Sequence, residues 1–278
     1  MSFLAKLEAR YQNTGASLCV GIDPNPAMLP KRFPHTARGI FQFLKIIIEV
    51  TQPHAAAYKP NLAFFESLGA EGQVLLEKVL GLIPDTIPYI IDAKRGDIGS
   101  SSEQYAKAIF EQLGADAVTV SPYMGYDSVA PFLEFEGKGV FILGLTSNPG
   151  RSDVQLLKLE NGQHVFESLM QSFQAKPSKA ARGWVIGATL GDLSQKAVAA
   201  SGTDAILVPG VGAQGGDLKT IFAHAHAKNP AHVIINASRS ILYASTGSDF
   251  AERAAAEALG LAEQIKLVNR QDAKDASI

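Results

Sequence analysis

The chain has 278 residues, of which 46% are hydrophobic and 19% charged, and its formal net charge is −2. These are values of a globular chain long enough for one large domain or two ordinary ones. The near-neutral balance and the absence of any apolar stretch of ~18–20 residues argue against a nucleic-acid partner and against a membrane-bound or membrane-spanning protein.

The first ten residues mix charged and apolar side chains, which predicts an amphipathic helix and no signal peptide. Cys19 is the only cysteine and lies in an apolar run, so it has no partner for an intrachain disulfide and is expected to have a packing role. Both observations favour a cytoplasmic protein.

Eight short apolar segments predict strands: residues 17–22, 55–59, 87–94, 115–121, 139–146, 183–188, 205–209 and 232–237. Segments with helical spacing alternate with most of them: residues 40–48, 74–82, 100–113, 127–136, 165–173, 192–200, 216–227 and 250–268. Strands that alternate with single helices predict right-handed βαβ units and a parallel sheet. Eight such units predict an α/β fold, a single (β/α)8 barrel of the TIM type over residues 1–278. An open doubly wound sheet is the alternative.

Two segments depart from this regular alternation. Residues 148–180, before the sixth strand, contain NPG and KPS turns and predict a loop plus a helix with extra turns. We interpret this segment as an extension within the barrel and not as a domain boundary. The polar residues after about 271 predict a frayed tail.

The sequence DAKRGDI at residues 92–98 follows directly after the apolar run 87–91. Strand side chains alternate between faces, so Asp92 and Lys94 point the same way. Gly96 is expected to let the chain turn before Asp97. A run this apolar predicts a strand buried on both faces, with its charged end at an opening. A strand-end salt bridge on a solvated loop is the alternative.

Polar residues follow nearly every predicted strand: Asp23, Lys59, Asp92 with Lys94, Ser121, Thr146 with Ser147, Thr189, residues 209–216 and residues 236–239. In a barrel these strand ends meet on one face, which is where active sites lie.

The segments after the seventh and eighth strands predict a phosphate site. Glycines at 210, 212, 215 and 216 let backbone N–H groups approach an anion, and Gln214 offers a side-chain amide. Arg239 supplies a planar fork suited to bidentate phosphate binding. A tight turn is the alternative for the glycine-rich segment alone.

No cofactor motif stands out. The six histidines have no metal-ligand spacing, and the chain has no Cys/His cluster and no nicotinamide or flavin fingerprint. Asp23, Asp92 and Asp97 could still gather around a metal ion.

Taken together, these motifs resemble the orotidine 5′-phosphate decarboxylase family, in its longer bacterial form. The resemblance covers nearly the whole chain through residues 21–24, 58–61, 92–98, 145–147, 208–216 and 236–239. The Asp-x-Lys-x-x-Asp pattern is shared with a wider set of sugar-phosphate barrels, whereas DAKRGDI, YKP and PGVGAQ are specific to the family.

The resemblance implies a cofactor-free, metal-free homodimer of barrels that converts orotidine 5′-phosphate to UMP in pyrimidine biosynthesis, with active sites shared between subunits. Its implied catalytic residues are Lys59, Asp92, Lys94 and Asp97, with Asp97 reaching into the partner's site. Its implied substrate-binding residues are Asp23, Ile98, Ser101, Ser147, Pro209, Gln214, Gly215 and Arg239. Of these, Asp23 and Lys59 would bind the ribose, Ser147 the pyrimidine, and Gln214 with Arg239 the phosphate.

Lys94 is the expected proton donor, because decarboxylation leaves negative charge on C6 of the pyrimidine and an ammonium can both stabilise and protonate it. Three other functions are alternatives. One is a metal-dependent decarboxylase or aldolase of sugar phosphates from the same group of barrels, and another is a nucleotide-binding barrel without catalysis. The third is a Schiff-base aldolase using Lys94 or Lys59, which the flanking carboxylates disfavour because they keep the amine protonated.

Overall fold

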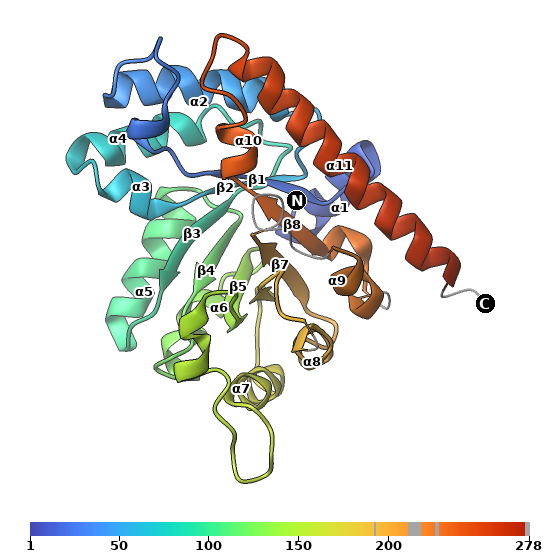
Figure 1. Cartoon of the computed structure of the whole chain (residues 1–278). Helices are drawn as coiled ribbons and strands as arrows, with labels where there is room; N and C mark the ends of the chain where they lie inside the picture. The colour runs from blue at the N-terminus through green and yellow to red at the C-terminus, as the bar shows by residue number, and fades with distance from the viewer. Residues whose placement is uncertain (192, 211–217, 226–227, 276–278) are drawn as a thin grey trace.

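A computed structural model of the chain describes residues 1–191, 193–210, 218–225 and 228–275. Eight parallel strands form one sheet in the order β2-β1-β8-β7-β6-β5-β4-β3, surrounded by helices (Figure 1). Parallel bridges from Tyr58 to Tyr89 and from Asn61 to Asp92 join β2 to β3 and bring the two end strands together. The predicted (β/α)8 barrel is thus confirmed and the open sheet is excluded.

The strands match the predicted segments to within a few residues. Their bounds are β1 Leu18–Ile22, β2 Ala57–Pro60, β3 Ile90–Arg95, β4 Ala117–Val120, β5 Gly139–Leu145, β6 Ala181–Ile186, β7 Ala205–Pro209 and β8 Val233–Ala237. The helices are α1 Phe3–Thr14, α2 Ala37–Thr51, α3 Leu62–Glu66, α4 Ala70–Leu80, α5 Gly99–Lys107, α6 Ala130–Leu133, α7 Val165–Gln174, α8 Leu193–Ala200, α9 Leu218–Ala225, α10 Arg239–Leu242 and α11 Phe250–Asp275.

The helix predicted over residues 127–136 is wrong in length. The structure has a 3₁₀ turn at Tyr126–Ser128 followed by the four-residue helix α6. In a helix starting at Asp127, the amide of residue 131 would donate to the Asp127 carbonyl, and Pro131 has no N–H. At the other end of the chain, α11 continues to Asp275, past residue 271, where we expected the polar tail to begin.

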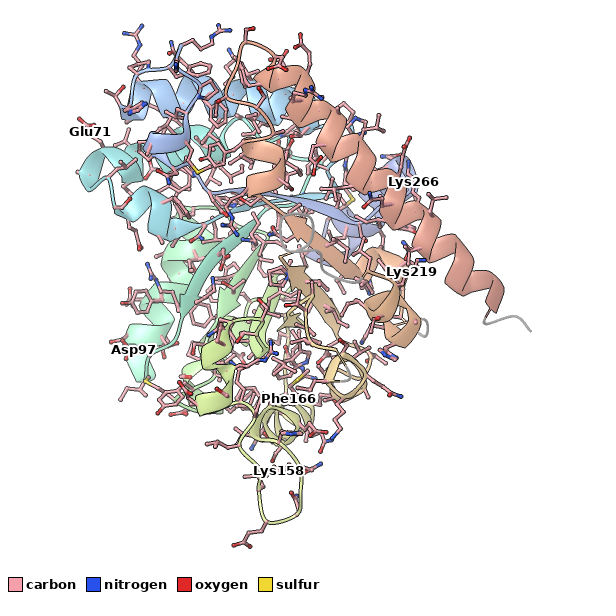
Figure 2. The ribbon with its side chains drawn as sticks, viewed as in Figure 1. Glu71, Asp97, Lys158, Phe166, Lys219 and Lys266 are labelled. Carbon is pink, nitrogen blue, oxygen red and sulfur yellow. The ribbon has the colours of Figure 1, made fainter. Side chains whose placement is uncertain are left out.

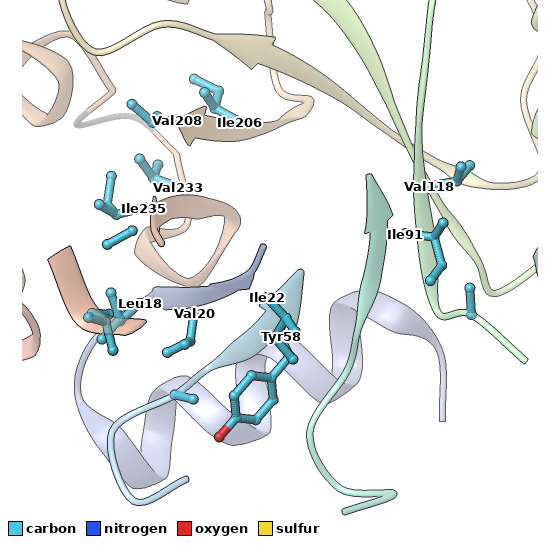
Figure 3. Close-up of a cluster of buried hydrophobic side chains, with 14 of the residues drawn as sticks. Leu18, Val20, Ile22, Tyr58, Ile91, Val118, Ile206, Val208, Val233 and Ile235 are labelled. Carbon is cyan, nitrogen blue, oxygen red and sulfur yellow. The ribbon is translucent and has the colours of Figure 1, made fainter. Parts of the chain in front are cut away.

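Alternation along the strands divides the core into two parts. Side chains such as Leu18, Val20 and Ile22 of β1 point outward and pack under the helices, as do the equivalent positions of the other strands (Figure 3). The interleaved positions, among them Cys19, Ala57, Ile90, Ala117, Phe141, Leu207 and Ile234, form a second buried cluster. Burial raises the pKa of the Cys19 thiol to about 12, which agrees with the packing role predicted for it.

The predicted N-terminal helix is α1, and it covers one end of the barrel. Its first turn is capped by Ser2, and it ends at Gly15, whose φ is 68°. Phe3 is buried with its ring edge-on to Phe141, 5.7 Å between centroids, and Lys6 bonds Asp116 at 2.7 Å. Phe3 and Leu7 of α1 thus pack against the inward apolar side chains of the strands.

The inward positions become polar toward the carboxyl ends of the strands. Lys59, Asp92, Thr119 and Asn236 each lie two residues beyond an apolar inward residue of their own strand. All four side chains are buried. The same alternation that fills the barrel with apolar side chains therefore places charged and hydrogen-bonding groups at its open end.

Residues 148–180 form the expected extension. After β5 the chain makes a 3₁₀ turn at Pro149–Asp153, pairs Lys158 with His164, and enters α7 (Figures 1 and 2). Among the described residues, no helix has the length and apolar character needed to cross a membrane.

Candidate active site

A cavity of about 240 Å³ opens at the carboxyl ends of the strands. It is lined by Asp23, Lys59, Asn61, Asp92, Ser147, Pro209, Gly210, Asn236, Ser238, Arg239 and Ser240. Six predicted site residues are in this set: Asp23, Lys59, Asp92, Ser147, Pro209 and Arg239. Side chains from β2, β3 and β8 and from the segments after β1, β5 and β7 thus converge on one space.

Asp92 is the centre of a charged network. The Lys59 Nζ donates to its Oδ2 at 2.6 Å, and the Lys94 Nζ donates to its Oδ1 at 2.5 Å. Lys59 is 4% exposed and Asp92 9%, whereas the Lys94 side chain is 51% exposed. One carboxylate therefore holds two ammonium groups, one deep in the barrel and one open to solvent.

The pKa values of the buried pair show that both groups stay charged. Burial alone raises the pKa of Asp92, but the ammonium groups of Lys59 and Lys94 outweigh it and hold the pKa far below its usual range. Burial alone lowers the pKa of Lys59, but Asp92 and Asp23 outweigh it and raise the pKa. The site thus presents fixed charges at neutral pH.

Asp97, Ile98 and Ser101 do not join this network within the chain. The Asp97 carboxylate accepts the backbone N–H of Ile98 at 2.8 Å, and none of the three residues lines the cavity. Asp97 lies just before α5, at the edge of the barrel (Figure 2). The side chains of Ile98 and Ser101 are exposed.

The conformation of the DAKRGDI segment corrects one expectation. We expected Gly96 to provide the turn, but the left-handed residue is Lys94, with φ 47°. It is the one non-glycine residue with positive φ in the described part of the chain. At Gly96 the constraint is space, because a Cβ there would lie 2.8 Å from the Ser121 carbonyl oxygen.

Ser147 is held at the cavity by the extended segment. Arg151 Nη1 donates to the carbonyls of Thr146 and Ser147 at 3.3 and 3.2 Å, and the Gln155 Oε1 accepts the Thr146 N–H at 2.8 Å. A Cβ at position 187 would lie 2.8 Å from the Ser147 nitrogen, so only glycine allows this approach. The 148–180 segment therefore supports the site from outside the barrel.

Several polar atoms around the cavity are buried and have no hydrogen-bond partner among the described residues: Asp23 Oδ1, Asn236 Oδ1, Ser238 Oγ and Ser240 Oγ. An unsatisfied buried polar atom is costly, and a cluster of them indicates groups reserved for a ligand. We expected Asn236 and Ser238 among the polar strand ends of residues 236–239, without a specific role, whereas Asn61 and Ser240 were not predicted as site residues. The inward position of Asn236 on β8 agrees with its place in the cavity lining.

The predicted phosphate site is only partly described. Pro209, Gly210 and Arg239 lie at the cavity, at the ends of β7 and β8, whereas Gln214 and Gly215 fall outside the described residues. In the described part of the chain, no group of three or more His, Cys, Asp or Glu residues has an arrangement that could hold a metal ion.

Comparison with known proteins agrees with this geometry. The sequence model of the orotidine 5′-phosphate decarboxylase / HUMPS family matches residues 16–254. The orotidine 5′-phosphate decarboxylase of Herpetosiphon aurantiacus is 46% identical over 91% of this chain and 93% of its own length. The orotidine 5′-phosphate decarboxylase of Ralstonia pickettii is 43% identical over 95% of this chain and 98% of its own length. The structure of Leishmania donovani OMP decarboxylase superposes with a TM-score of 0.82 at 35% identity, covering 97% of this chain and 99% of that one. A family match over most of a chain whose cavity is lined by Lys59 and Asp92, with Lys94 bonded to Asp92 beside it, shows that this chain belongs to the orotidine 5′-phosphate decarboxylase / HUMPS family.

Proposed function

We propose that this chain is a carboxy-lyase that converts orotidine 5′-phosphate to UMP and CO₂, the UMP-forming step of pyrimidine biosynthesis. The observation that carries the proposal is the Lys59–Asp92–Lys94 network at the open end of the barrel, beside a cavity with unpartnered polar atoms. The curated relatives named above, with which the chain shares nearly its full length, carry this activity in their names.

For this reaction, the protein must stabilise negative charge on C6 of the pyrimidine and protonate that carbon. When the C6–carboxylate bond breaks, CO₂ departs and the electron pair remains on C6 of the pyrimidine. Lys94 Nζ gives a proton to C6, and its positive charge stabilises that carbon while the charge develops. Asp92 fixes the direction of the ammonium through the 2.5 Å contact. Proton transfer then leaves a neutral amine, which solvent reprotonates, in keeping with the half-exposed position of Lys94.

The remaining side chains divide among the parts of the nucleotide. Asp23 and Lys59 bind the ribose hydroxyls, and the unpartnered Asp23 Oδ1 is an acceptor for one of them. Ser147 contacts the pyrimidine. Pro209, Gln214, Gly215 and Arg239 surround the 5′-phosphate, to which Arg239 contributes its positive charge. The phosphate contacts lie away from the broken bond, and their binding energy acts by holding C6 against Lys94.

We further propose that the enzyme is a homodimer of single-domain subunits, in which Asp97, Ile98 and Ser101 complete the site of the partner. Two features support this. Asp97 forms no ion pair with Lys94 of its own subunit, which pairs with Asp92, and it is followed by Ile98, which is 60% exposed. Tyr123, which follows β4, is a second large hydrophobic residue at the surface, and it is 79% exposed. Exposed hydrophobic side chains beside an active site are available for contact with a partner subunit.

The reaction itself requires no cofactor or metal in this proposal, and the free, buried Cys19 is consistent with a cytoplasmic enzyme. The test follows the ultraviolet absorbance of orotidine 5′-phosphate after adding the protein in EDTA. We expect loss of the orotate absorbance and formation of UMP. No reaction in EDTA, with turnover of a ketose phosphate once Mg²⁺ is restored, would assign the chain to the sugar-phosphate branch. Binding of UMP with no turnover under either condition would instead indicate a non-catalytic barrel.

A further inference from the structure

The pairing of β3 with β4 is irregular at the active site. Ile91 pairs with Val118 and Arg95 pairs with Val120, so between these pairs β3 has three residues and β4 has only Thr119. The three residues are Asp92, Ala93 and Lys94, the charged centre of the site. Bulges of this kind leave backbone groups without ladder partners and redirect side chains.

The backbone at Lys94 has an unfavourable conformation. Its φ of 47° lies in the left-handed region, which residues with a side chain rarely adopt. Such a conformation persists only where surrounding contacts hold it, and it is common at functional sites. The bulge therefore needs a specific support.

The Thr119 side chain provides that support. Its Oγ1 accepts the backbone N–H groups of Ala93 and Lys94, each at 3.1 Å, and donates to Asp92 Oδ1 at 2.9 Å. A hydroxyl has one hydrogen and two lone pairs, so this arrangement uses its full capacity. The direction of the bonds is fixed, because both amides can only donate and the ionised carboxylate can only accept. Thr119 is 1% exposed, so water does not replace it.

We propose that Thr119 is a positioning residue for the decarboxylation, one that acts through Asp92 and Lys94 without touching the substrate. This inference rests on the proposed function. The hydroxyl holds Lys94 in the left-handed conformation and fixes Asp92 Oδ1, the atom that receives the Lys94 ammonium. The carboxylate oxygen Oδ2 remains free for Lys59. One side chain of β4 thus sets the backbone and the side chain of the proton donor together.

Loss of this support is expected to slow the chemical step more than it weakens binding. Of the described residues proposed to hold the ribose and the phosphate, Lys59 contacts the bulge, through Asp92 Oδ2, whereas Thr119 bonds the other carboxylate oxygen. Asp23 and Arg239 come from the ends of β1 and β8, outside the bulge. Displacement of a reacting group by about 1 Å can reduce a rate by about 100-fold. A merely structural role would instead lower the amount of folded enzyme and leave kcat per intact site unchanged.

The test compares Thr119→Val, which keeps the shape and removes the hydroxyl, with Thr119→Ser, which keeps the hydroxyl. The kcat measured with orotidine 5′-phosphate is divided by the concentration of intact sites, which is determined by titration with UMP. Thr51→Val is the matched control. Thr51 is also fully buried, and its hydroxyl donates to the Ile47 carbonyl at 2.7 Å, but it lies on α2, outside the barrel.

For Thr119→Val we expect kcat per site to fall about 10- to 100-fold while KM changes less than about threefold. Thr119→Ser should restore kcat to within about threefold of the wild type, and Thr51→Val should leave kcat per site unchanged. If Thr119→Val yields too little folded protein, Thr119→Ala is measured in the same way, with the same expected loss of kcat.

Three results would overturn the inference: wild-type kcat per site in the variant without the hydroxyl, a rise in KM with unchanged kcat, or a serine variant as slow as the valine variant. Each can occur with a wild-type enzyme that is fully active, so each leaves the proposed function intact. A wild-type chain that leaves orotidine 5′-phosphate unchanged would overturn the proposed function, and this inference with it.

Discussion

The ammonium of Lys59 lies 2.6 Å from Oδ2 of Asp92, inside a barrel where both side chains are almost fully buried. Two charges at this depth are stable only as a pair, since removal of either partner leaves an uncompensated charge away from water. Lys94 adds a second positive charge on the other carboxylate oxygen. The contact therefore links the stability of the barrel to the chemistry at its open end.

The first prediction concerns acid stability. Burial disfavours the charged Asp92, but Lys59 and Lys94 outweigh this and keep its pKa far below the usual range. Below about pH 4 the unfolded chain takes up a proton at this position while the folded chain does not, so the free energy of unfolding falls as the pH falls. Asp92→Asn removes this contribution, which amounts to about 2 kcal/mol at neutral pH.

Urea unfolding at a series of pH values from 7 to about 3 measures this difference. The curve of unfolding free energy against pH should be flatter for Asp92→Asn than for the wild type. Asp153→Asn changes an exposed carboxylate on the 148–180 segment, so its curve of unfolding free energy against pH should be parallel to that of the wild type. Parallel curves for all three proteins would show that Asp92 is not a stabilising carboxylate.

The second prediction concerns the proton donor. In the proposed mechanism, Lys94→Ala removes both the positive charge beside C6 and the source of the proton, so we expect kcat to fall by at least about 10⁴-fold. Binding of UMP should survive, because the ribose and phosphate contacts are made by other residues. Isothermal titration with UMP and the absorbance assay measure the two properties separately. Lys158→Ala, on the projecting segment shown in Figure 2, is the control. Near-normal turnover by the Lys94 variant would remove Lys94 from the chemistry.

The third prediction concerns the phosphate site. Arg239→Ala should lower kcat/KM for orotidine 5′-phosphate about 10- to 100-fold, the range expected for a charge-assisted hydrogen bond. Orotidine, which lacks the phosphate, should be turned over equally slowly by the variant and the wild type. Arg253→Ala, on the exposed face of α11, should change neither value. An equal loss for both substrates would mean that Arg239 acts on the fold and not on the phosphate.

The fourth prediction concerns the shared site. Lys94→Ala and Asp97→Ala should each be inactive alone. In a mixed dimer one site carries both substitutions and the other carries neither, so mixing equal amounts should restore activity to about a quarter of the wild type. Refolding the two proteins together, followed by the absorbance assay, measures this. No recovery from dimers shown to be mixed would place Lys94 and Asp97 in the same subunit's site.

Sequence patterns located most of this site. The alternation of strands with helices predicted the barrel, and period-two alternation predicted that Asp92 and Lys94 point the same way. The two side chains do meet at 2.5 Å, but through the bulge and the left-handed Lys94 and not through regular alternation. Residues 236–239, at the end of β8, were likewise expected on the face of the active site, and Asn236, Ser238 and Arg239 line the cavity. The DAKRGDI segment was harder to predict in detail, since Gly96 looked like the turn residue and Lys94 has the left-handed φ.

The sequence by itself determined the order of the elements, the face on which each strand residue lies, and the residue types at the open end of the barrel. These properties depend on the spacing of apolar and polar residues over short stretches of the sequence. Only the tertiary structure decided which of those residues meet. Asp92 contacts Lys59 and Thr119 because β3 lies between β2 and β4, and at the bulge the Lys94 amide donates to Thr119 Oγ1. Such contacts join residues 25 to 33 positions apart, and their energies depend on burial and on the exact register of neighbouring strands, which no local pattern contains.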